Sequence, residues 1–324
     1  MSEIKRTVVM LTNPLGGYNL LHGEAVTALA KEAGISVFEG CDPDQIAVAL
    51  HTIAAAKPDL LIVNGGDGTV RAVAQAMRQE KIFEKEPMLA LLRGGSTNMI
   101  QNDVGWKGKP AQAMRRLIAR LEQGLEGTHV LSRAPLSVRR ADEEGEEYGF
   151  FWGAGALPRV TAKTQEGYAQ GATRGLLGEL FTLLGVMKSL VLGGTSRDPR
   201  LAPTEIGWRR ADASTAAQAS PRLFVFITTL DRLILGLAPG SSGEGLKLVS
   251  LRHPHTCRDL LSYLLARGQP VAREGANFEF ESGAELALKL TGDWVLDGEF
   301  FKGSSDSALL HLKTGKPFRF LCLK

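Results

Sequence analysis

Three glycine-rich turns, each directly after a short apolar run, constrain the fold of this chain more than any other feature of its sequence. The turns, at residues 13–17, 65–69 and 94–98, read Asn-Pro-Leu-Gly-Gly, Gly-Gly-Asp-Gly-Thr and Gly-Gly-Ser-Thr-Asn. The apolar runs before them predict strands at residues 7–11, 60–63 and 89–92. Because loops at the carboxyl ends of parallel strands line the ligand crevice of an open sheet, the three turns are expected to converge on one ligand.

Alternation of strands and helices continues over the first 130 residues or so and predicts a doubly wound α/β domain. The predicted helices begin after the first turn, at Asp42-Pro43, at Thr69 and at Pro110. From about residue 134 the pattern changes to strands, at 136–139, 148–152, 204–210, 222–230, 246–251, 277–281 and 285–291. The fold class expected is an α/β N-terminal domain with a mainly parallel sheet, followed by a β-rich C-terminal domain of the sandwich type.

Composition excludes several classes of protein. The 324 residues are 44% hydrophobic and 23% charged, as in ordinary globular proteins, and the net charge of +3 is too small to predict a nucleic-acid partner. Three scattered cysteines and a polar N-terminus favour a cytoplasmic protein. The most apolar stretch, 176–192, is too short and too interrupted for a membrane span, so it predicts a core helix, with lining of an acyl-chain cleft or membrane contact as the alternative.

The second turn has the chemistry of a phosphate site. Its glycines allow close backbone approach, Thr69 is expected to begin a helix whose N-terminus attracts anions, and Asp67 could contact a metal ion or a hydroxyl. The alternative is a tight strand-to-helix turn in which Asp67 caps the helix. The chain lacks the P-loop, the Rossmann fingerprint and the serine-hydrolase and zinc motifs, so the turns favour a nucleotide-dependent kinase of another type.

With a downstream Leu296-Asp297-Gly298-Glu299, the three turns occur in an order that resembles the diacylglycerol kinase catalytic-domain family. That family includes bacterial lipid kinases, sphingosine kinases and ceramide kinases. The stretch 237–249 is similar to a glycine-rich segment of the same family. The Gly-Gly-Asp-Gly-Thr element alone is shared with NAD kinases, and the downstream Asp-Gly-Glu makes the lipid-kinase branch more specific.

The resemblance implies an ATP site between two domains, residues 1–133 with 310–324 returning to them, and a lipid-substrate domain at 134–309. It implies a phosphate cradle made of Asn13, Gly16, Gly17, Gly65, Gly66, Asp67, Gly68, Thr69, Gly94, Gly95, Ser96, Thr97 and Asn98. Asp297 would be the general base, with Asp67 as a further catalytic carboxylate, and Glu299 would place Mg²⁺ or orient the base. Without the upstream turns, Asp297-Gly298 would be read as a hairpin turn.

The expected activity is transfer of the γ-phosphate of ATP to a lipid hydroxyl at the membrane surface. Diacylglycerol, a sphingoid base and ceramide remain open as acceptors, and the oligomeric state is not constrained. A NAD kinase is the alternative enzyme; it would carry an Asn-Glu pair, for which Asn102-Asp103 is the nearest equivalent. A non-catalytic lipid- or nucleotide-binding module on the same fold is the third possibility. Arg93 stands where the family commonly has proline, either as a cation near the phosphates or as a solvated strand end.

Overall fold

The chain forms two units that are described separately. The computed structural model describes residues 6–169, 202–210, 219–233, 236–240, 245–253, 259, 262–263, 265–268, 277–303 and 308–323. The first unit comprises Met1–Arg133 and Pro317–Lys324, and the second comprises Ala134–Lys316. The apolar stretch 176–192, predicted to be a core helix, lies outside the described residues.

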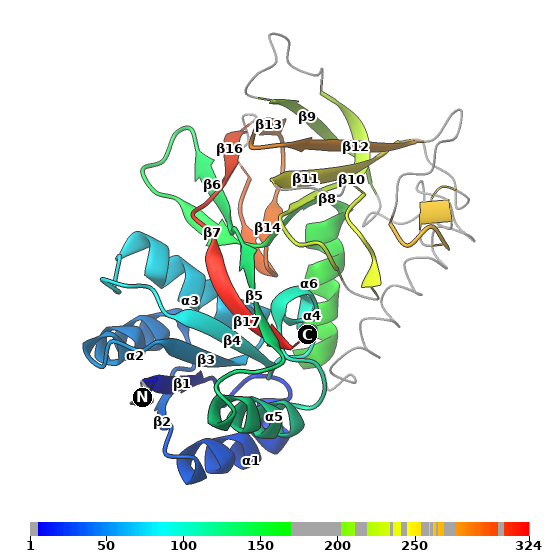
Figure 1. The fold of residues 1–324 in the computed structure, drawn as a ribbon. Helices are drawn as coiled ribbons and strands as arrows, with labels where there is room; N and C mark the ends of the chain where they lie inside the picture. Colours follow the sequence, from blue (N-terminus) through cyan, green and yellow to red (C-terminus); the bar gives the residue numbers. More distant parts are fainter. Residues whose placement is uncertain are drawn as a thin grey trace. The chain divides into compact units, whose positions relative to one another are not determined.

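The first domain is a six-stranded sheet with helices on both faces (Figure 1). Its strand order is β2-β1-β3-β4-β17-β5, parallel from β2 to β17 and antiparallel only between β17 and β5. Its strands are β1 (Val8–Thr12), β2 (Ser36–Glu39), β3 (Leu60–Gly65), β4 (Met88–Arg93), β5 (Thr128–Arg133) and β17 (Phe318–Leu323). Its helices are α1 (Asn19–Glu32), α2 (Pro43–Ala55), α3 (Asp67–Gln79), α4 (Met99–Val104) and α5 (Pro110–Glu122).

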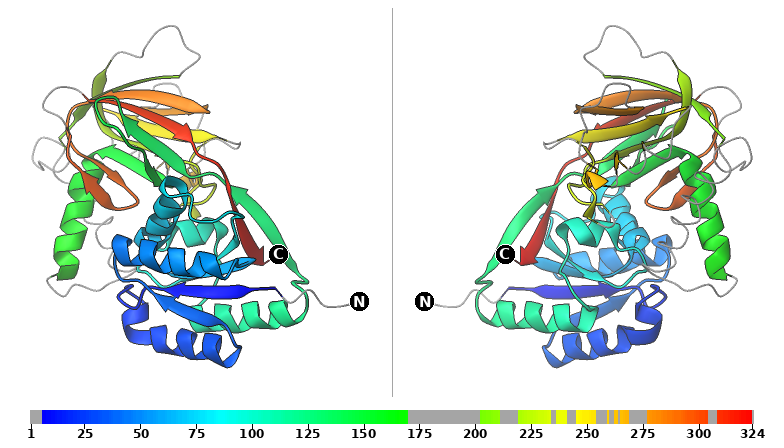
Figure 2. Two further views of the ribbon diagram at one scale, coloured as in Figure 1. Left: turned by 90° about the vertical axis from the view of Figure 1, so that its left-hand side faces the viewer. Right: turned by 90° about the vertical axis from the view of Figure 1, so that its right-hand side faces the viewer.

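Local sequence explains where these helices begin. Asp42 caps α2 by accepting a hydrogen bond from the Gln45 backbone N–H at 2.8 Å, and Pro43 occupies the first turn, as predicted. The α1 and α5 helices pack on one face of the sheet, and α2 and α3 pack together on the other (Figure 2). Strand β3 is buried along its whole length, which explains its unbroken apolar sequence.

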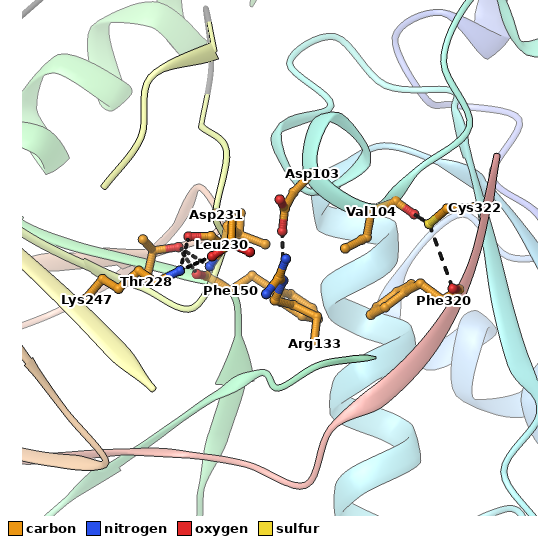
Figure 3. A network of polar contacts seen from close by, with 10 residues as sticks. All are labelled: Asp103, Val104, Arg133, Phe150, Thr228, Leu230, Asp231, Lys247, Phe320 and Cys322. Carbon is orange, nitrogen blue, oxygen red and sulfur yellow. Dashed lines mark hydrogen bonds and ion pairs between the residues drawn. The ribbon is translucent and has the colours of Figure 1, made fainter. Parts of the chain in front are cut away.

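The last strand returns to the first domain and is inserted between β4 and β5. The indole N–H of Trp106 donates a hydrogen bond to the Leu321 carbonyl at 2.7 Å. The Cys322 thiol donates to the Val104 carbonyl at 3.0 Å, as Figure 3 shows. Burial raises the pKa of the Cys322 thiol to about 11, so the thiol is a neutral donor. The preceding strand, β16, belongs to the second domain, so the return begins at Pro317 and not at residue 310.

The second domain is an antiparallel, branched sheet. Strand order runs β15-β14-β8-β10-β9-β13-β16-β6-β7, and β11 and β12 extend from β10. Its elements are β6 (Leu136–Arg140), β7 (Glu147–Gly149), β8 (Phe151–Gly155), α6 (Ala156–Ala169), β9 (Thr204–Arg210), β10 (Ser220–Thr228), β11 (Leu246–Arg252), β12 (Phe278–Gly283), β13 (Glu285–Leu290), β14 (Trp294–Leu296), β15 (Glu299–Phe301) and β16 (Ala308–Thr314).

Alternate residues of this sheet gather in one buried cluster. The pattern is clear in β13, where Leu286, Leu288 and Leu290 all belong to the cluster. Trp152 and Trp294 join it from the neighbouring strands β8 and β14, with ring centroids 6.3 Å apart. One continuous sheet therefore folds around one core, and the predicted combination of an α/β domain with an antiparallel β-rich domain is confirmed. None of the helices in the described part of the chain is long and apolar enough to span a membrane.

The contact between Trp106 and β17 predicts a measurable stability loss. Trp106→Phe keeps most of the buried ring but leaves the Leu321 carbonyl without this donor, so we expect about 1–3 kcal/mol of destabilisation in urea unfolding. Val48→Ala is the control, because Val48 is 67% exposed on α2 and should change stability by less than about 0.5 kcal/mol. Equal stability of the Trp106 variant and the wild type would show that this hydrogen bond does not hold the returning strand.

Candidate active site

The three glycine-rich turns meet at the carboxyl ends of β1, β3 and β4. The Gly94 N–H donates to the Gly65 carbonyl at 3.0 Å, which joins the third turn to the second. The Tyr18 N–H donates to the Gly94 carbonyl at 3.0 Å, which joins the first turn to the third. The structure therefore brings together the loops that the sequence predicts to share one ligand.

Close backbone packing explains why these positions are glycines. A Cβ on Gly95 would lie 2.3 Å from the Gly66 Cα, and a Cβ on Gly16 would lie 2.7 Å from the Gly94 carbonyl oxygen. Gly68 differs, because a Cβ there would meet no atom within 4 Å and the residue is exposed in the first turn of α3. Gly95 and Gly16 are therefore glycines because the loops pack closely there, whereas the space beside Gly68 is open.

Hydrogen bonds from buried amide side chains hold the glycine-rich turns in place, and the sequence reasoning did not predict these side chains. The Asn19 side-chain NH₂ donates to the Asn13 carbonyl at 2.8 Å and to the Asn64 carbonyl at 3.0 Å. The Gln101 side-chain NH₂ donates to the Gly65 carbonyl at 2.9 Å. Asn64 is fully buried and directly follows the apolar run 60–63. A polar residue at the end of this run is the sequence signal that could have singled it out.

Asn13 and Thr69 contact each other. The Asn13 side-chain NH₂ donates to Thr69 Oγ1 at 3.1 Å, and Asn13 Oδ1 accepts the Leu15 N–H at 2.9 Å. Helix α3 begins at Asp67, two residues before the predicted Thr69, and Thr69 is buried. These two side chains therefore join the first turn to the second, and the groups of the α3 N-terminus left for an anion are the backbone N–H groups of its first turn.

Asp67 holds the third turn through the short helix that follows it. Its carboxylate accepts the Met99 N–H at 2.9 Å and the Ile100 N–H at 2.8 Å, the first residues of α4. Burial raises the pKa of the Asp67 carboxyl, against the backbone N–H groups of Ile100 and Met99 and the nearby Arg93, which lower it. The capping alternative is therefore realised, but on α4 rather than on the helix to which Asp67 belongs.

The remaining residues of the third turn are arranged around Asn98. Asn98 has φ of 53°, and its side chain accepts the Gly95 N–H at 2.9 Å and donates to the Gly95 carbonyl at 2.7 Å. Ser96 and Thr97 are half-buried, and a Cβ on Gly17 would lie 2.3 Å from Ser96 Oγ. The turn is thus closed on itself by Asn98 and contacts the first turn through Ser96.

Polar residues on both sides of this turn are used within the first domain. Arg93 is half-buried and donates to the Asn102 side-chain oxygen, so it is not a solvated strand end. Asp103 pairs with Arg133 at 2.8 Å (Figure 3). The Asn102-Asp103 pair, the nearest equivalent of the Asn-Glu pair expected of a NAD kinase, is therefore engaged by two arginines.

Asp297 lies in the second domain, in a two-residue hairpin turn between β14 and β15. Asp297 and Gly298 both have positive φ, 48° and 89°, as the type I′ turn requires. The Asp297 carboxylate is buried and accepts the Phe150 N–H at 2.9 Å and the Phe151 N–H at 2.8 Å. Asp297 and Gly298 therefore form the hairpin turn that the sequence also allowed. The two backbone donors orient both oxygens of the Asp297 carboxylate.

The Asp297 carboxylate also packs closely against Gly149. A Cβ on Gly149 would lie 2.6 Å from Asp297 Oδ2, so only glycine allows this approach. Glu299 follows in β15 and is half-buried. Within the described ranges no group of three or more histidine, cysteine or acidic side chains could hold a metal ion. Glu299 is the carboxylate nearest to the Asp297 turn in sequence.

The difference between Gly95 and Gly68 gives a test of the cradle. Gly95→Ala places a methyl group against the Gly66 backbone, so we expect about 1–3 kcal/mol of destabilisation in urea unfolding. Gly68→Ala has open space and a helical position, so its stability should equal or exceed that of the wild type by up to about 1 kcal/mol. Similar losses in the two variants would contradict the packing described here.

Comparisons with known proteins agree with this geometry. Residues 7–129 match the family model of the diacylglycerol kinase catalytic domain. No curated protein matches the sequence. Among solved structures, a protein of Bacillus anthracis str. Sterne, provisionally named a diacylglycerol kinase, aligns with a TM-score of 0.68 at 16% identity, over 99% of this chain and 98% of that one.

Two further structures extend the comparison. A diacylglycerol kinase from the same Bacillus strain gives a TM-score of 0.61 at 13% identity, over 99% and 98% of the two chains. Yeast NADH kinase in complex with NADH gives 0.51 at 9% identity, over 99% of this chain and 84% of that one. At such identities these likenesses show the fold. The fold is thus shared with diacylglycerol and NADH kinases, and the resemblance to the diacylglycerol kinase catalytic-domain family is confirmed over residues 7–129.

Proposed function

We propose that this protein is an ATP-dependent lipid kinase that transfers the γ-phosphate to a lipid hydroxyl. The observation that supports this most directly is the cradle of three glycine turns within a segment that matches a diacylglycerol kinase catalytic domain. The first-turn N–H groups of α3 and the open space at Gly68 suit a polyphosphate, since a helix N-terminus attracts negative charge. The acceptor is a lipid at a membrane surface.

The residues of the first domain divide into two roles. Gly68, with Ser96 and Thr97, faces the phosphates of the nucleotide. A second group keeps the loops at a fixed separation. This group comprises Asn13, Gly16, Gly17, Gly65, Gly66, Asp67, Thr69, Gly94, Gly95 and Asn98. Asp67 thus serves the reaction through the loop that it holds.

Asp297 is the general base. Phosphoryl transfer to an alcohol requires a group that receives the hydroxyl proton as the oxygen attacks, and a carboxylate within hydrogen-bond reach can do this. Two backbone donors fix the orientation of the Asp297 carboxylate. Mg²⁺, held by the phosphates and by Glu299, would neutralise charge on the transferring group.

The NADH kinase fold keeps a NAD kinase as the second candidate. Against it stands the pair Asn102-Asp103, where a NAD kinase would be expected to carry Asn-Glu; both residues are engaged by arginines. The match of residues 7–129 to the diacylglycerol kinase model also favours the lipid acceptor.

A transfer assay separates these candidates. Purified protein would be incubated with labelled ATP, Mg²⁺ and detergent-dispersed diacylglycerol, sphingosine or ceramide, with NAD in a parallel sample. Label in one lipid is the expected result and identifies the acceptor class. Label in NAD alone would establish the second candidate. ATP binding without transfer to any of these acceptors would favour a binding module.

Asp297→Asn should lower kcat by about 100-fold or more, with little change in the KM for ATP. Asparagine can accept only one of the two N–H donors at this turn, so the variant's stability must be measured beside its activity. Asp142→Asn, at an exposed acidic residue of the same domain, is the control and should retain full activity. Unchanged kcat in Asp297→Asn would exclude its role as the base.

Gly68→Ala tests the nucleotide site separately from stability. A methyl group in the open space should weaken ATP binding by about tenfold or more, as measured by isothermal titration calorimetry, while the unfolding free energy is maintained. The exposed variant Val48→Ala should bind ATP like the wild type. Full ATP affinity in Gly68→Ala would place the phosphates elsewhere.

A further inference from the structure

We infer that Lys247 and Thr228 are positioning residues that hold the Asp297 carboxylate in place through one peptide group of β8. This inference rests on the proposed role of Asp297 as the base. The residues form a continuous series of contacts in the second domain, from the ion pair of Lys247 with Asp231 to Phe150, one of the backbone donors of Asp297. Figure 3 shows this series as far as Phe150.

The series begins at a buried cation. The Lys247 side chain is only 2% exposed, whereas that of its partner Asp231 is 50% exposed. The Lys247 ammonium also donates to the Leu230 carbonyl at 3.2 Å. Because a buried ammonium is strongly unfavourable without a partner, the pair fixes residues 230 and 231 against β11.

The hydroxyl of Thr228 connects Leu230 to Phe150, the residue directly before β8. In the sheet register Thr228 pairs with Lys247 of β11 on one side and with Phe151 of β8 on the other. Thr228 Oγ1 accepts the Leu230 N–H at 3.1 Å and donates to the Phe150 carbonyl at 2.7 Å. The hydroxyl therefore has a donor and an acceptor, which sets the direction of its own proton.

A single peptide group then connects Thr228 to Asp297. The Phe150 carbonyl and the Phe151 N–H belong to the same planar peptide, so fixing one fixes the direction of the other. That N–H donates to Asp297 Oδ1 at 2.8 Å, and the Phe151 carbonyl accepts the Asp297 N–H at 2.8 Å. The Phe150 carbonyl also accepts the Thr229 N–H at 3.4 Å, so loss of the Thr228 hydroxyl would weaken the restraint on this peptide and would loosen the carboxylate.

Thr228→Val and Thr228→Ser form the central comparison. Valine keeps the shape of the side chain and removes the hydroxyl, while serine keeps the hydroxyl. In Thr228→Val we expect amide hydrogen exchange at Phe151 to accelerate by about tenfold and kcat to fall by a similar factor, with the KM for ATP unchanged. Thr228→Ser should restore both quantities to within about twofold of the wild type.

Lys247→Met extends the test to the ion pair, with Lys302→Met as its control because the Lys302 side chain is 95% exposed. Lys247→Met should accelerate exchange at Phe151 and lower kcat, whereas Lys302→Met should change neither. Loss of stability in Thr228→Val without a change in exchange or kcat would assign Thr228 a purely structural role and overturn the inference.

The exchange measurement needs no turnover, which keeps the two proposals distinguishable. If the wild type transfers phosphate to no acceptor, the proposed function fails, and exchange at Phe151 alone supports or overturns the connection from Lys247 to Asp297. If the wild type is active and Thr228→Val exchanges faster with full kcat, the connection exists but does not position a base.

Discussion

The contact between the Gly66 and Gly95 backbones sets the geometry on which the first domain depends. A Cβ atom on Gly95 would lie 2.3 Å from the Gly66 Cα. The second and third turns can therefore approach this closely only because residue 95 is a glycine. This approach brings the Gly94 N–H to the Gly65 carbonyl and Asp67 to the start of α4. The N–H groups of Gly94 and Gly95 are used within the loops, so the donors proposed for a phosphate are those of the first turn of α3.

The two aspartates of the proposed site are used in the same way in different domains. Asp67 accepts two consecutive N–H groups at the start of α4, and Asp297 accepts two consecutive N–H groups at the start of β8. In each case a carboxylate fixes a short stretch of backbone and is itself fixed by it. The difference lies in the local fold, a helix terminus for Asp67 and a left-handed hairpin turn for Asp297.

Sequence reasoning succeeded where local signals are strong and missed what depends on long-range contacts. The apolar runs and glycine turns predicted β1, β3 and β4 and their convergence, and Asp42-Pro43 predicted the start of α2. The buried amides of Asn19 and Gln101 could not be found this way. Each donates to a carbonyl group of a residue distant in sequence, and amide side chains are more often exposed.

The assignment of β17 to the first domain also depends on long-range contacts. Both β16 and β17 are short apolar strands near the C-terminus, and neither periodicity nor composition assigns them to different sheets. The assignment follows from partners: β16 pairs with β13 and β6, whereas β17 receives the Trp106 indole N–H at Leu321. A single buried donor on a loop after α4 thus helps to decide which domain the last residues complete, because an unmet carbonyl there would cost more than the hydrogen bond itself contributes.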